Sequence, residues 1–571
     1  MATSKSSVRE TTFDPETLEE QARIAFPRLS ETQIEKIARI AKPKEFADGE
    51  TLWAVGDREA AFHVISEGVV AIRQPIAGGG SHLIVSHGPG GFTGDIDLLS
   101  SKASAVEGVA SGATKTLAVC PETLKKLVVA DPEISDILLA AFLARRRLLI
   151  ARSRGELTLI GSRYSPKLYA LREFLERNSR PFTWIDLESD PEAEQLLDSF
   201  QIGPEETPAV ITSETVCRSP NVECLADVLG LSDIGGDDEM YDLAIVGAGP
   251  AGLASAVYGG SEGLHTIVLD AHAPGGQAAT SSKIENYLGF PMGISGADLA
   301  QNALVQAEKF GVRLATPRRV VKLHVDGAIY RLELENGENV RARAVVVASG
   351  VRYRRLPAEN ARDFEGSGIY FAATRMEADL CRGEEVAIVG GGNSAGQAAV
   401  FLSGCAKHVH ILIRSGGLEH SMSRYLIDRI ESLPNVTLHP HTEIRRFEGD
   451  GRLERIDVAD NRTDETSPLP VSSVFVFIGA VANTDWLEGL VPRDRNGFVH
   501  TGEALSDEDL REARWNEEAR PSMFETALPG VFAVGDVRCN STKRVASAVG
   551  EGSVVVQFVH KRVAGSPATP R

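Results

Sequence analysis

The stretch YDLAIVGAGPAGLASAVYGGSEGLHTIVLDA, residues 241–271, decides the fold that this sequence predicts. Residues 241–246 are mostly apolar, which predicts a buried parallel strand, and GAGPAG at 247–252 is followed by an alanine-rich helix. The next strand ends on Asp270, about twenty residues beyond the glycines, so the stretch forms a complete dinucleotide-binding fingerprint. The helix N-terminus offers free N–H groups to a pyrophosphate, and Asp270 is placed to accept hydrogen bonds from a ribose.

A second fingerprint follows further along the chain. EEVAIVGGGNSAGQAA at 384–399 again predicts a strand, a glycine turn and a helix, with Gly390, Gly392 and Ala395 at the fingerprint positions. LPGVFAVGDVR at 528–538 then returns to the opening fold, and Asp536 at its end is placed to hydrogen-bond a cofactor ribitol. An α/β protein with two nucleotide-binding folds, the second inserted in the first, is therefore expected, with boundaries at 240–356, 357–478 and 479–565.

The order of motifs over about 240–565 resembles the low-molecular-weight thioredoxin reductases. The motifs are GAGPAG, GGQ, IEN with YLGFP, ASG, GGGNSA, FIGAVANT and VFAVGD. The resemblance implies an FAD-dependent NADPH oxidoreductase, thioredoxin-disulfide reductase-like, in which hydride passes from NADPH to FAD, and it implies a homodimer. Contacts with FAD are expected on the outer fold, at Gly247, Gly249, Pro250, Ala251, Gly252, Asp270, Gly275, Gly276, Gln277, Asn286, Ser349, Gly350, Gly535, Asp536, Arg544 and Val545. Contacts with the nicotinamide nucleotide are expected at Gly390, Gly392, Asn393, Ser394 and Ala395.

Two departures from that family limit the chemistry. The His-Arg-Arg clamp of the family is replaced by Ile413-Arg414-Ser415, where Arg414, with help from Arg424, can hold a 2′-phosphate and favours NADPH over NADH. The redox CxxC is replaced by AATRM at 372–376, and Cys381, alone and off position, is expected to be a packing residue. No catalytic residue is predicted, and the electron acceptor is left open between a partner disulfide, a ferredoxin, a quinone and dioxygen.

Residues 15–152 are predicted to form a small β-barrel or jelly roll, with short strands at 51–55, 61–65, 69–73, 82–86, 106–110 and 116–120. FADGETLWAVGD, AFHVISEGVVAIR and GPGGFTGDIDLLSSKASAV resemble the cyclic-nucleotide-binding domain. Gly94 and Asp95 match the ribose-binding Gly-Glu pair of that family, but its phosphate-binding Arg is missing, and Lys102 is a weaker substitute. Two readings stay open: a domain that binds a cyclic nucleotide through Gly94, Asp95 and Lys102, or a domain that only packs or dimerises.

Residues 155–232 predict a strand, a helix, a second strand, an acidic helix and a third strand entered through Thr207-Pro208. This order resembles the thioredoxin/glutaredoxin fold, but Ser162 and Ser165 stand where the CxxC would be, so dithiol exchange is not expected there. Cys217 and Cys224 are expected to be packing residues, with a non-standard redox pair as the alternative. The module is predicted to be a docking surface or a spacer.

Composition excludes other classes. With 571 residues, a net charge of −19 and no basic run, the chain is expected to have several domains and not to bind nucleic acid. No apolar run reaches about 18 residues, and the N-terminus has no signal-peptide core, so a cytoplasmic protein without a membrane span is expected. His408, His410, His439 and His441 have no ligand partner at a metal-binding spacing, and no metal site is predicted. The alternative to an enzyme is a signalling protein that senses redox state or a cyclic nucleotide with little turnover.

Overall fold

The fold is described from a computed structural model that covers residues 23–564 except 58, 76–80, 96, 101–103, 105, 152–156, 191–192, 213–214, 237, 282 and 516–517. Lys102, the predicted phosphate ligand, lies outside these described residues. The chain divides into two compact units, the first up to residue 158 with 179–183 and 211–216, and the second with 159–178, 184–210 and 217 onward. Among the described residues, none of the helices is both long enough and apolar enough to cross a bilayer.

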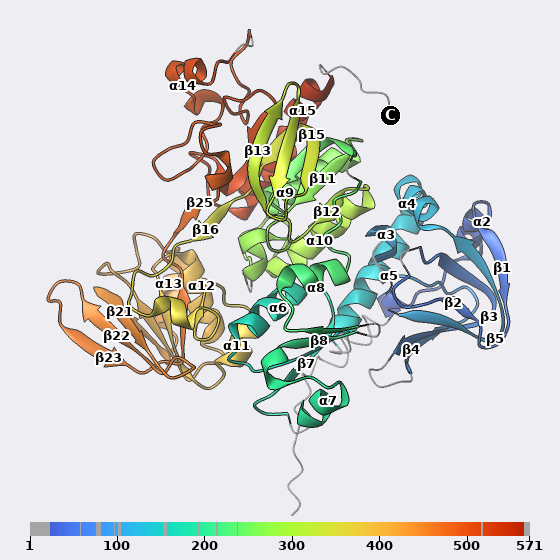
Figure 1. Ribbon diagram of the computed structural model, residues 1–571, viewed down its shortest axis with the longest axis horizontal. Coiled ribbons are helices and arrows are strands. Elements are labelled where there is room, and N and C mark those ends of the chain that lie inside the picture. The colour runs from blue at the N-terminus through green and yellow to red at the C-terminus, as the bar shows by residue number, and fades with distance from the viewer. Residues whose placement is uncertain are drawn as a thin grey trace, which may run out of the picture. The chain divides into compact units, whose positions relative to one another are not determined.

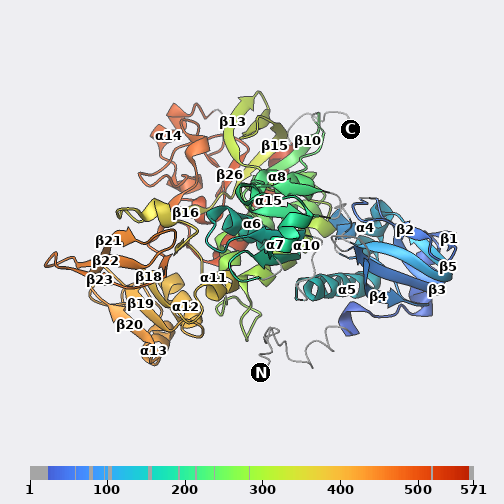
Figure 2. The ribbon, with the colours of Figure 1, turned by 60° about the horizontal axis from the view of Figure 1, so that its bottom comes forward.

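The first unit is an antiparallel sheet with helices, as predicted (Figure 2). Its strands have the order β1-β5-β3-β4, with β2 paired to β5. The elements are α2 (Glu31–Ala38), β1 (Lys42–Phe46), β2 (Thr51–Trp53), β3 (Phe62–Pro75), β4 (Ser81–His87), α3 (Asp97–Ser100), β5 (Glu107–Val119), α4 (Pro121–Ala130) and α5 (Pro132–Ala151).

The first unit has fewer strands than the sequence predicts, because two of its strands continue through a glycine. The segments 61–65 and 69–73 form one strand, β3, and 106–110 and 116–120 form one strand, β5. Gly68 and Gly112 have φ of +80° and +81°, and the β3–β5 register shifts around Glu67. The glycines therefore lie in bulges within paired strands and do not end them.

The middle module has the element order that the sequence predicts. It contains β6 (Leu157–Gly161), α6 (Pro166–Arg177), β7 (Phe182–Asp186), α7 (Ala193–Ser199), β8 (Ala209–Ile211), β9 (Val216–Arg218) and α8 (Val222–Val228), with the strand order β7-β6-β8-β9. Helix α6 begins at Ser165, whose hydroxyl accepts from the Leu168 N–H, and Pro166 occupies its first turn. The Thr207–Pro208 peptide is cis. The relationship to thioredoxin stays a prediction.

The outer nucleotide fold is a mostly parallel sheet of order β12-β11-β10-β15-β14-β13, with β26 paired to β15 (Figure 1). Apolar side chains cover both faces of the central strands, as expected of a parallel sheet between helices. Its elements are β10 (Met240–Val246), α9 (Pro250–Ser261), β11 (Thr266–Leu269), α10 (Gly296–Lys309), β12 (Arg313–Ala315), β13 (Val320–Asp326), β14 (Ile329–Leu334), β15 (Asn339–Val347), α14 (Asp507–Glu512), β26 (Val531–Ala533) and α15 (Val545–Ala564).

The inserted fold interrupts this sheet between β15 and β26. Its parallel sheet has the order β17-β24-β18-β19-β20, and an antiparallel sheet β21-β22-β23 lies beside it (Figure 2). The elements are β16 (Val351–Tyr353), β17 (Ile369–Tyr370), α11 (Arg375–Leu380), β18 (Glu385–Val389), α12 (Asn393–Leu402), β19 (His408–Leu412), α13 (Arg424–Glu431), β20 (Val436–His439), β21 (Thr442–Glu448), β22 (Arg455–Asp460), β23 (Thr466–Leu469), β24 (Ser473–Val476) and β25 (Ala480–Ala482). The antiparallel pair β16–β25 joins the insertion to the outer fold. The predicted architecture, with one nucleotide-binding fold inserted in another, is confirmed.

Candidate functional site

A cavity of about 1850 Å³ lies in the second unit, at the carboxyl ends of the outer parallel strands. Val246 ends β10 and Leu269 ends β11, while Ala348 and Val534 directly follow β15 and β26, and all four line the cavity. The first turn of α9 opens onto it as well. This is the edge at which open α/β sheets bind nucleotides, because helix N-termini and flexible loops converge there.

The fingerprint glycines have two roles: Gly247 and Gly252 allow close packing of the backbone, and Gly249 borders the cavity. A Cβ on Gly247, whose φ is +108°, would lie 2.3 Å from the Ala348 carbonyl oxygen, and a Cβ on Gly252 would lie 1.8 Å from the Gly247 oxygen. A Cβ on Gly249 would meet no protein atom closer than the Gly276 Cα, at 3.9 Å. The absence of a side chain at Gly249 therefore leaves room for a bound group and is not required by the protein's own packing.

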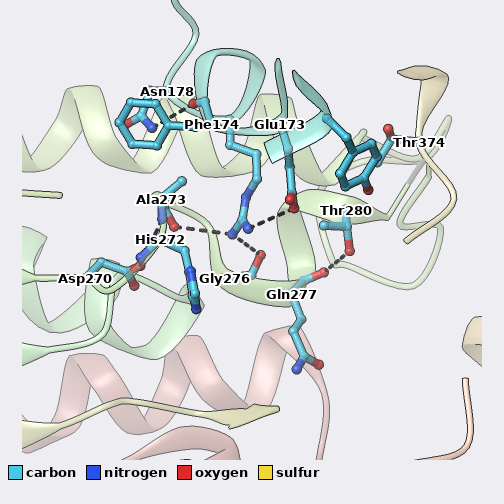
Figure 3. Close-up of polar contacts among 12 residues, drawn as sticks. Glu173, Phe174, Asn178, Asp270, His272, Ala273, Gly276, Gln277, Thr280 and Thr374 are labelled. Atoms are coloured by element: carbon cyan, nitrogen blue, oxygen red, sulfur yellow. Dashed lines mark hydrogen bonds and ion pairs between the residues drawn. The ribbon is translucent and has the colours of Figure 1, made fainter. Parts of the chain in front are cut away.

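Asp270 braces the loops around the fingerprint (Figure 3). Its carboxylate accepts backbone N–H groups from Ala248 at 2.7 Å, His272 at 2.8 Å and Ala273 at 3.0 Å. An ionised carboxylate has about four acceptor positions, so Asp270 keeps capacity for a ribose hydroxyl after these three bonds. The sequence assigned Asp270 to a ribose, and the structure adds a role in shaping the site.

The structure brings most of the predicted FAD residues to this cavity. The predicted residues that line it are Gly247, Gly249, Pro250, Ala251, Asp270, Gly276, Gln277, Ser349, Gly350, Asp536, Arg544 and Val545. Burial raises the pKa of Asp536, and the positive charge of Lys543 partly opposes this rise. Predicted residues outside the lining are Gly252, Gly275, Gly535 and the exposed Asn286.

The second fingerprint is formed locally, at the end of β18 and the start of α12. Gly390 has a φ of +138°, and a Cβ there would lie 2.4 Å from the Phe477 oxygen. Of the predicted nicotinamide-nucleotide residues, Ser394 lines the large cavity and Gly390, Gly392, Asn393 and Ala395 do not. The Asn393 carboxamide oxygen is already used, because it accepts the Ser423 N–H at 2.7 Å.

The two predicted phosphate-binding arginines differ in their surroundings. Arg414 follows β19 and is exposed, and it makes no ion pair with any described residue. Arg424 is also exposed, but its Nε lies 2.8 Å from Asp428. Arg414 is therefore the freer of the two to bind a 2′-phosphate, although neither lines the large cavity.

The sequence did not indicate that α6 of the middle module forms a wall of this cavity. Arg177, the last residue of α6, donates from Nη2 to the carbonyl oxygens of Gly276 at 3.0 Å and Ala273 at 3.3 Å (Figure 3). Its Nη1 lies 3.5 Å from Glu173, and its buried Nε has no hydrogen-bond partner among the described residues. The Arg177 guanidinium thus adds positive charge to a wall of the cavity, which fits a bound anion.

The segment that replaces the family's redox motif is a helix start. Thr374 caps α11, and its N–H and hydroxyl donate to Glu377 Oε2 at 2.6 and 2.5 Å. The Tyr169 hydroxyl, from α6, donates to Glu377 Oε1 at 2.9 Å, and the Tyr169 ring lies 5.4 Å from that of Tyr370. Glu377 is 1% exposed, and burial raises its pKa against these hydrogen bonds.

The prediction that Cys381 is alone was wrong. Cys381 is fully buried in the core of the inserted fold, as expected of a packing residue, but Cys405 packs against the same core, and the Gly383 N–H donates to the Cys405 carbonyl at 2.9 Å. The Cys381 thiol itself donates to the Ala378 carbonyl, and the Cys405 thiol donates to the Leu402 carbonyl. Cys217 lies within β9 and Cys224 lies in the first turn of α8, and burial together with the nearby Cys224 raises the pKa of Cys217. Sequence spacing hid the first pair because a whole helix, α12, separates its members.

The histidines that the sequence singled out lie close together on the inserted sheet. His410 Nδ1 is 3.0 Å from His439 Nε2, and the rings of His408 and His410 are 4.7 Å apart. Glu385 approaches His410 at 3.5 Å. In the part of the chain that the structure describes, no group of three or more His, Cys, Asp or Glu side chains is arranged to hold a metal ion.

The first unit has a second, much smaller cavity of about 80 Å³. Gly94 and Asp95 line it, as the cyclic-nucleotide prediction requires. Trp53 also lines it, with Nε1 donating to the Val106 oxygen at 2.8 Å, and Arg145 donates to the Gly94, Phe92 and Ala25 carbonyls. The Arg145 guanidinium is thus already bound to the protein's own backbone.

Comparison with known proteins identifies the larger part of the second unit. Residues 241–552, more than half of the chain, match the family model of the pyridine nucleotide-disulphide oxidoreductases. The chain belongs to this family. Residues 43–131 match the model of the cyclic nucleotide-binding domain. The predicted relationships of residues 241–552 to this flavoprotein family and of residues 43–131 to the cyclic nucleotide-binding domain are confirmed, and FAD and NADPH are the cofactors of that flavoprotein family.

Individual relatives match the same share of this oxidoreductase. An NADH dehydrogenase of Ferdinandcohnia aciditolerans is 31% identical over 318 residues, 56% of either chain, so the chain spans about half the length of that relative. Thioredoxin reductase of Bacillus subtilis is 29% identical over 331 residues, 57% of this chain and 96% of the reductase. The crystal structure of Lactococcus lactis thioredoxin reductase in its FR conformation matches 57% of this chain and 100% of that chain, with a TM-score of 0.51 at 24% identity, and supports the fold alone.

Proposed function

We propose that the protein is an FAD-dependent NADPH oxidoreductase that passes electrons directly from its flavin site to an external acceptor. The observation that carries this proposal is the segment 372–376. It has the capped start of α11 where related enzymes hold a dithiol, beside a nucleotide cavity whose glycines, acid and helix N-terminus are all in place. An internal relay through cysteines at that position has no sulfur to use, because Met376 is a thioether.

The cavity residues fit FAD. Gly249 leaves open backbone beside the α9 N-terminus, which suits a pyrophosphate, and Asp270 keeps an acceptor for a ribose. Arg177 holds the Gly276 carbonyl and adds positive charge at the same wall. Bound FAD would supply the hydride-accepting ring, and these residues would hold its pyrophosphate and ribose. Burial of Asp536 raises its pKa, and a ribitol hydroxyl donating to it would replace the lost water.

The inserted fold is proposed to hold NADPH at the second fingerprint. Gly390 allows the tight turn, and the first turn of α12 offers N–H groups to the pyrophosphate. Arg414 is assigned to the 2′-phosphate. Replacing it with alanine should raise KM for NADPH about tenfold or more and leave KM for NADH unchanged, since a charge-assisted hydrogen bond is worth about 1.5–3 kcal/mol.

The acceptor is proposed to be a negatively charged molecule. Arg352, Arg354 and Arg355 are exposed residues of the cavity lining, in a protein whose net charge is −19. Arg352 is paired with Asp485 and Arg355 with Glu365, whereas Arg354 makes no ion pair with any described residue. Of the four acceptors, an acidic electron carrier such as a ferredoxin suits these arginines best.

The second candidate function is a redox sensor with little turnover, in which the first unit binds a cyclic nucleotide. The match of residues 43–131 and the placement of Gly94 and Asp95 favour such a ligand. The small cavity and the engaged Arg145 weaken this candidate. A homodimer is also proposed, on family grounds.

Steady-state NADPH oxidation tests the proposal. The rate of NADPH oxidation by the purified protein would be measured with four acceptors in turn: oxidised ferredoxin, a soluble quinone, dioxygen and a thioredoxin disulfide. The variant Gly249→Val serves as the control that lacks flavin. Turnover with at least one non-disulfide acceptor is expected. Flavin reduction without turnover on any acceptor would reject the enzyme in favour of the sensor.

A further inference from the structure

Two thiols of the inserted fold lie together although 24 positions separate them in the sequence. Cys381 is the residue that ends α11, and Cys405 follows the end of α12. The Gly383 N–H donates to the Cys405 carbonyl at 2.9 Å, and the Lys407 N–H donates to the Glu384 carbonyl at 2.8 Å. These backbone bonds hold the two segments side by side.

The surroundings of the two sulfurs differ. The Cys381 side chain is fully buried, while that of Cys405 is partly exposed. The neighbouring Cys381 thiol lowers the pKa of Cys405 to about 7, and Arg382 adds to this, while Asp379 opposes it. The neighbouring Cys405 and burial raise the pKa of Cys381. Because Cys405 is the accessible sulfur of the two, it is the one placed to meet an oxidant, and the buried Cys381 lies behind it.

We propose that Cys405 and Cys381 are a peroxide-sensitive thiol pair that forms a reversible disulfide, separate from the flavin reaction. A reactive, accessible thiolate backed by a second thiol is the arrangement found in redox-sensing sites. The disulfide would join the end of α11, whose first turn replaces the family's redox motif, to the end of α12, whose first turn carries the nucleotide fingerprint.

The reaction balances with a hydroperoxide as the oxidant. The Cys405 thiolate attacks one oxygen of hydrogen peroxide, the O–O bond breaks, and Cys405 sulfenic acid and hydroxide form. The Cys381 sulfur then attacks the Cys405 sulfur, the S–O bond breaks, and the disulfide forms with loss of water. The two sulfurs together lose two electrons, which the peroxide accepts, and an external dithiol reverses the change.

Peptide mapping of the full-length protein tests the proposal. Reduced protein would be treated with stepwise equivalents of hydrogen peroxide, quenched, alkylated under denaturing conditions and digested. The expected result is a peptide that links Cys381 to Cys405 after about one equivalent and disappears with dithiothreitol. It should appear equally in the control variant Cys217→Ser/Cys224→Ser, which removes the other thiol pair.

Single variants separate the two roles. In Cys381→Ser, Cys405 should stop at the sulfenic acid, be trapped by dimedone, and over-oxidise with excess peroxide. In Cys405→Ser, Cys381 should stay fully alkylatable, because it is buried and protonated. The proposal is overturned if wild-type Cys405 becomes sulfinic while Cys381 remains a free thiol, or if both thiols survive peroxide that oxidises Cys217 and Cys224. The mapping of the wild-type chain decides the question even where a variant fails to fold.

Discussion

Two cavities among the described residues lie in modules that resemble nucleotide-binding folds, and they differ in how their positively charged groups are used. In the second unit, the first turn of α9 and the charged Arg177 line a cavity of about 1850 Å³. In the first unit, the Arg145 guanidinium donates to three backbone carbonyls around a cavity of about 80 Å³. Small-molecule pockets usually measure about 300–1,000 Å³, so only the former has room for a nucleotide as it stands.

The difference teaches that a family match and a ligand site are separate properties. Both regions match their families, and both keep the glycine turns that fix the backbone. The donors decide the binding of an anion, because an anion needs N–H groups that the protein does not already use. In the oxidoreductase part, the first turn of α9 offers such N–H groups to the large cavity. In the N-terminal domain, the Arg145 guanidinium already donates to backbone carbonyls of that domain.

The largest effect is expected from Gly249→Val. The new side chain would extend into the cavity and not into the protein, since the nearest protein atom to its Cβ is 3.9 Å away. We expect folded protein with less than about one hundredth of the wild-type FAD affinity, a loss of roughly 3 kcal/mol or more. Flavin absorbance per chain, with circular dichroism for the fold, measures this. Gly252→Ala is the contrasting variant, and it should unfold the domain.

Arg177→Met should weaken FAD binding about tenfold to a hundredfold. The variant removes two hydrogen bonds to the 273–276 loop and a charge at the cavity wall, worth about 1.5–3 kcal/mol. Fluorescence titration of apoprotein with FAD gives the affinity. Lys167→Met is the matched control on the same helix, because Lys167 contacts Ser219 and lies outside the lining. Equal affinities for both variants would mean that α6 takes no part in FAD binding, which would leave the predicted role of the module as a docking surface or a spacer.

Glu377→Gln tests the helix start that replaces the dithiol. Burial raises the pKa of Glu377 above the ordinary value of 4.5, so the folded state favours the protonated carboxyl. The resulting stability is present below about pH 4.5 and is lost as pH rises through the raised pKa. The unfolding free energy of the variant relative to wild type should therefore rise from low to neutral pH. Urea melts across this range measure it, and parallel pH curves would contradict it.

The smallest effect is expected at the N-terminal cavity. Adding cAMP or cGMP to the full-length protein should give no calorimetric binding tighter than about 1 mM, because Arg145 is engaged and Trp53 lines the small cavity. Micromolar binding would show that this cavity opens and that another cation, such as Lys102, supplies the missing charge. That outcome would restore cyclic-nucleotide control to the account.

The fingerprint could be predicted because its residues lie close together in the sequence. Features that depend on contacts between distant segments could not be predicted. Gly247, Gly249 and Asp270 lie within one strand–turn–helix–strand unit, so their placement followed from spacing. Arg177 reaches the 273–276 loop from a helix about a hundred positions earlier, and no pattern in the sequence connects the two. Cys381 and Cys405 meet only because α11 and α12 end side by side. Asn286, carried over from the family motif, is exposed and does not line the cavity.

The central claim is that the flavin passes electrons onward without a dithiol in series. An anaerobic titration of purified protein with NADPH, followed by flavin absorbance, tests it most directly. The account predicts complete reduction at one equivalent of NADPH per FAD. Consumption of about two equivalents would show a second two-electron centre in exchange with the flavin, and would contradict the claim.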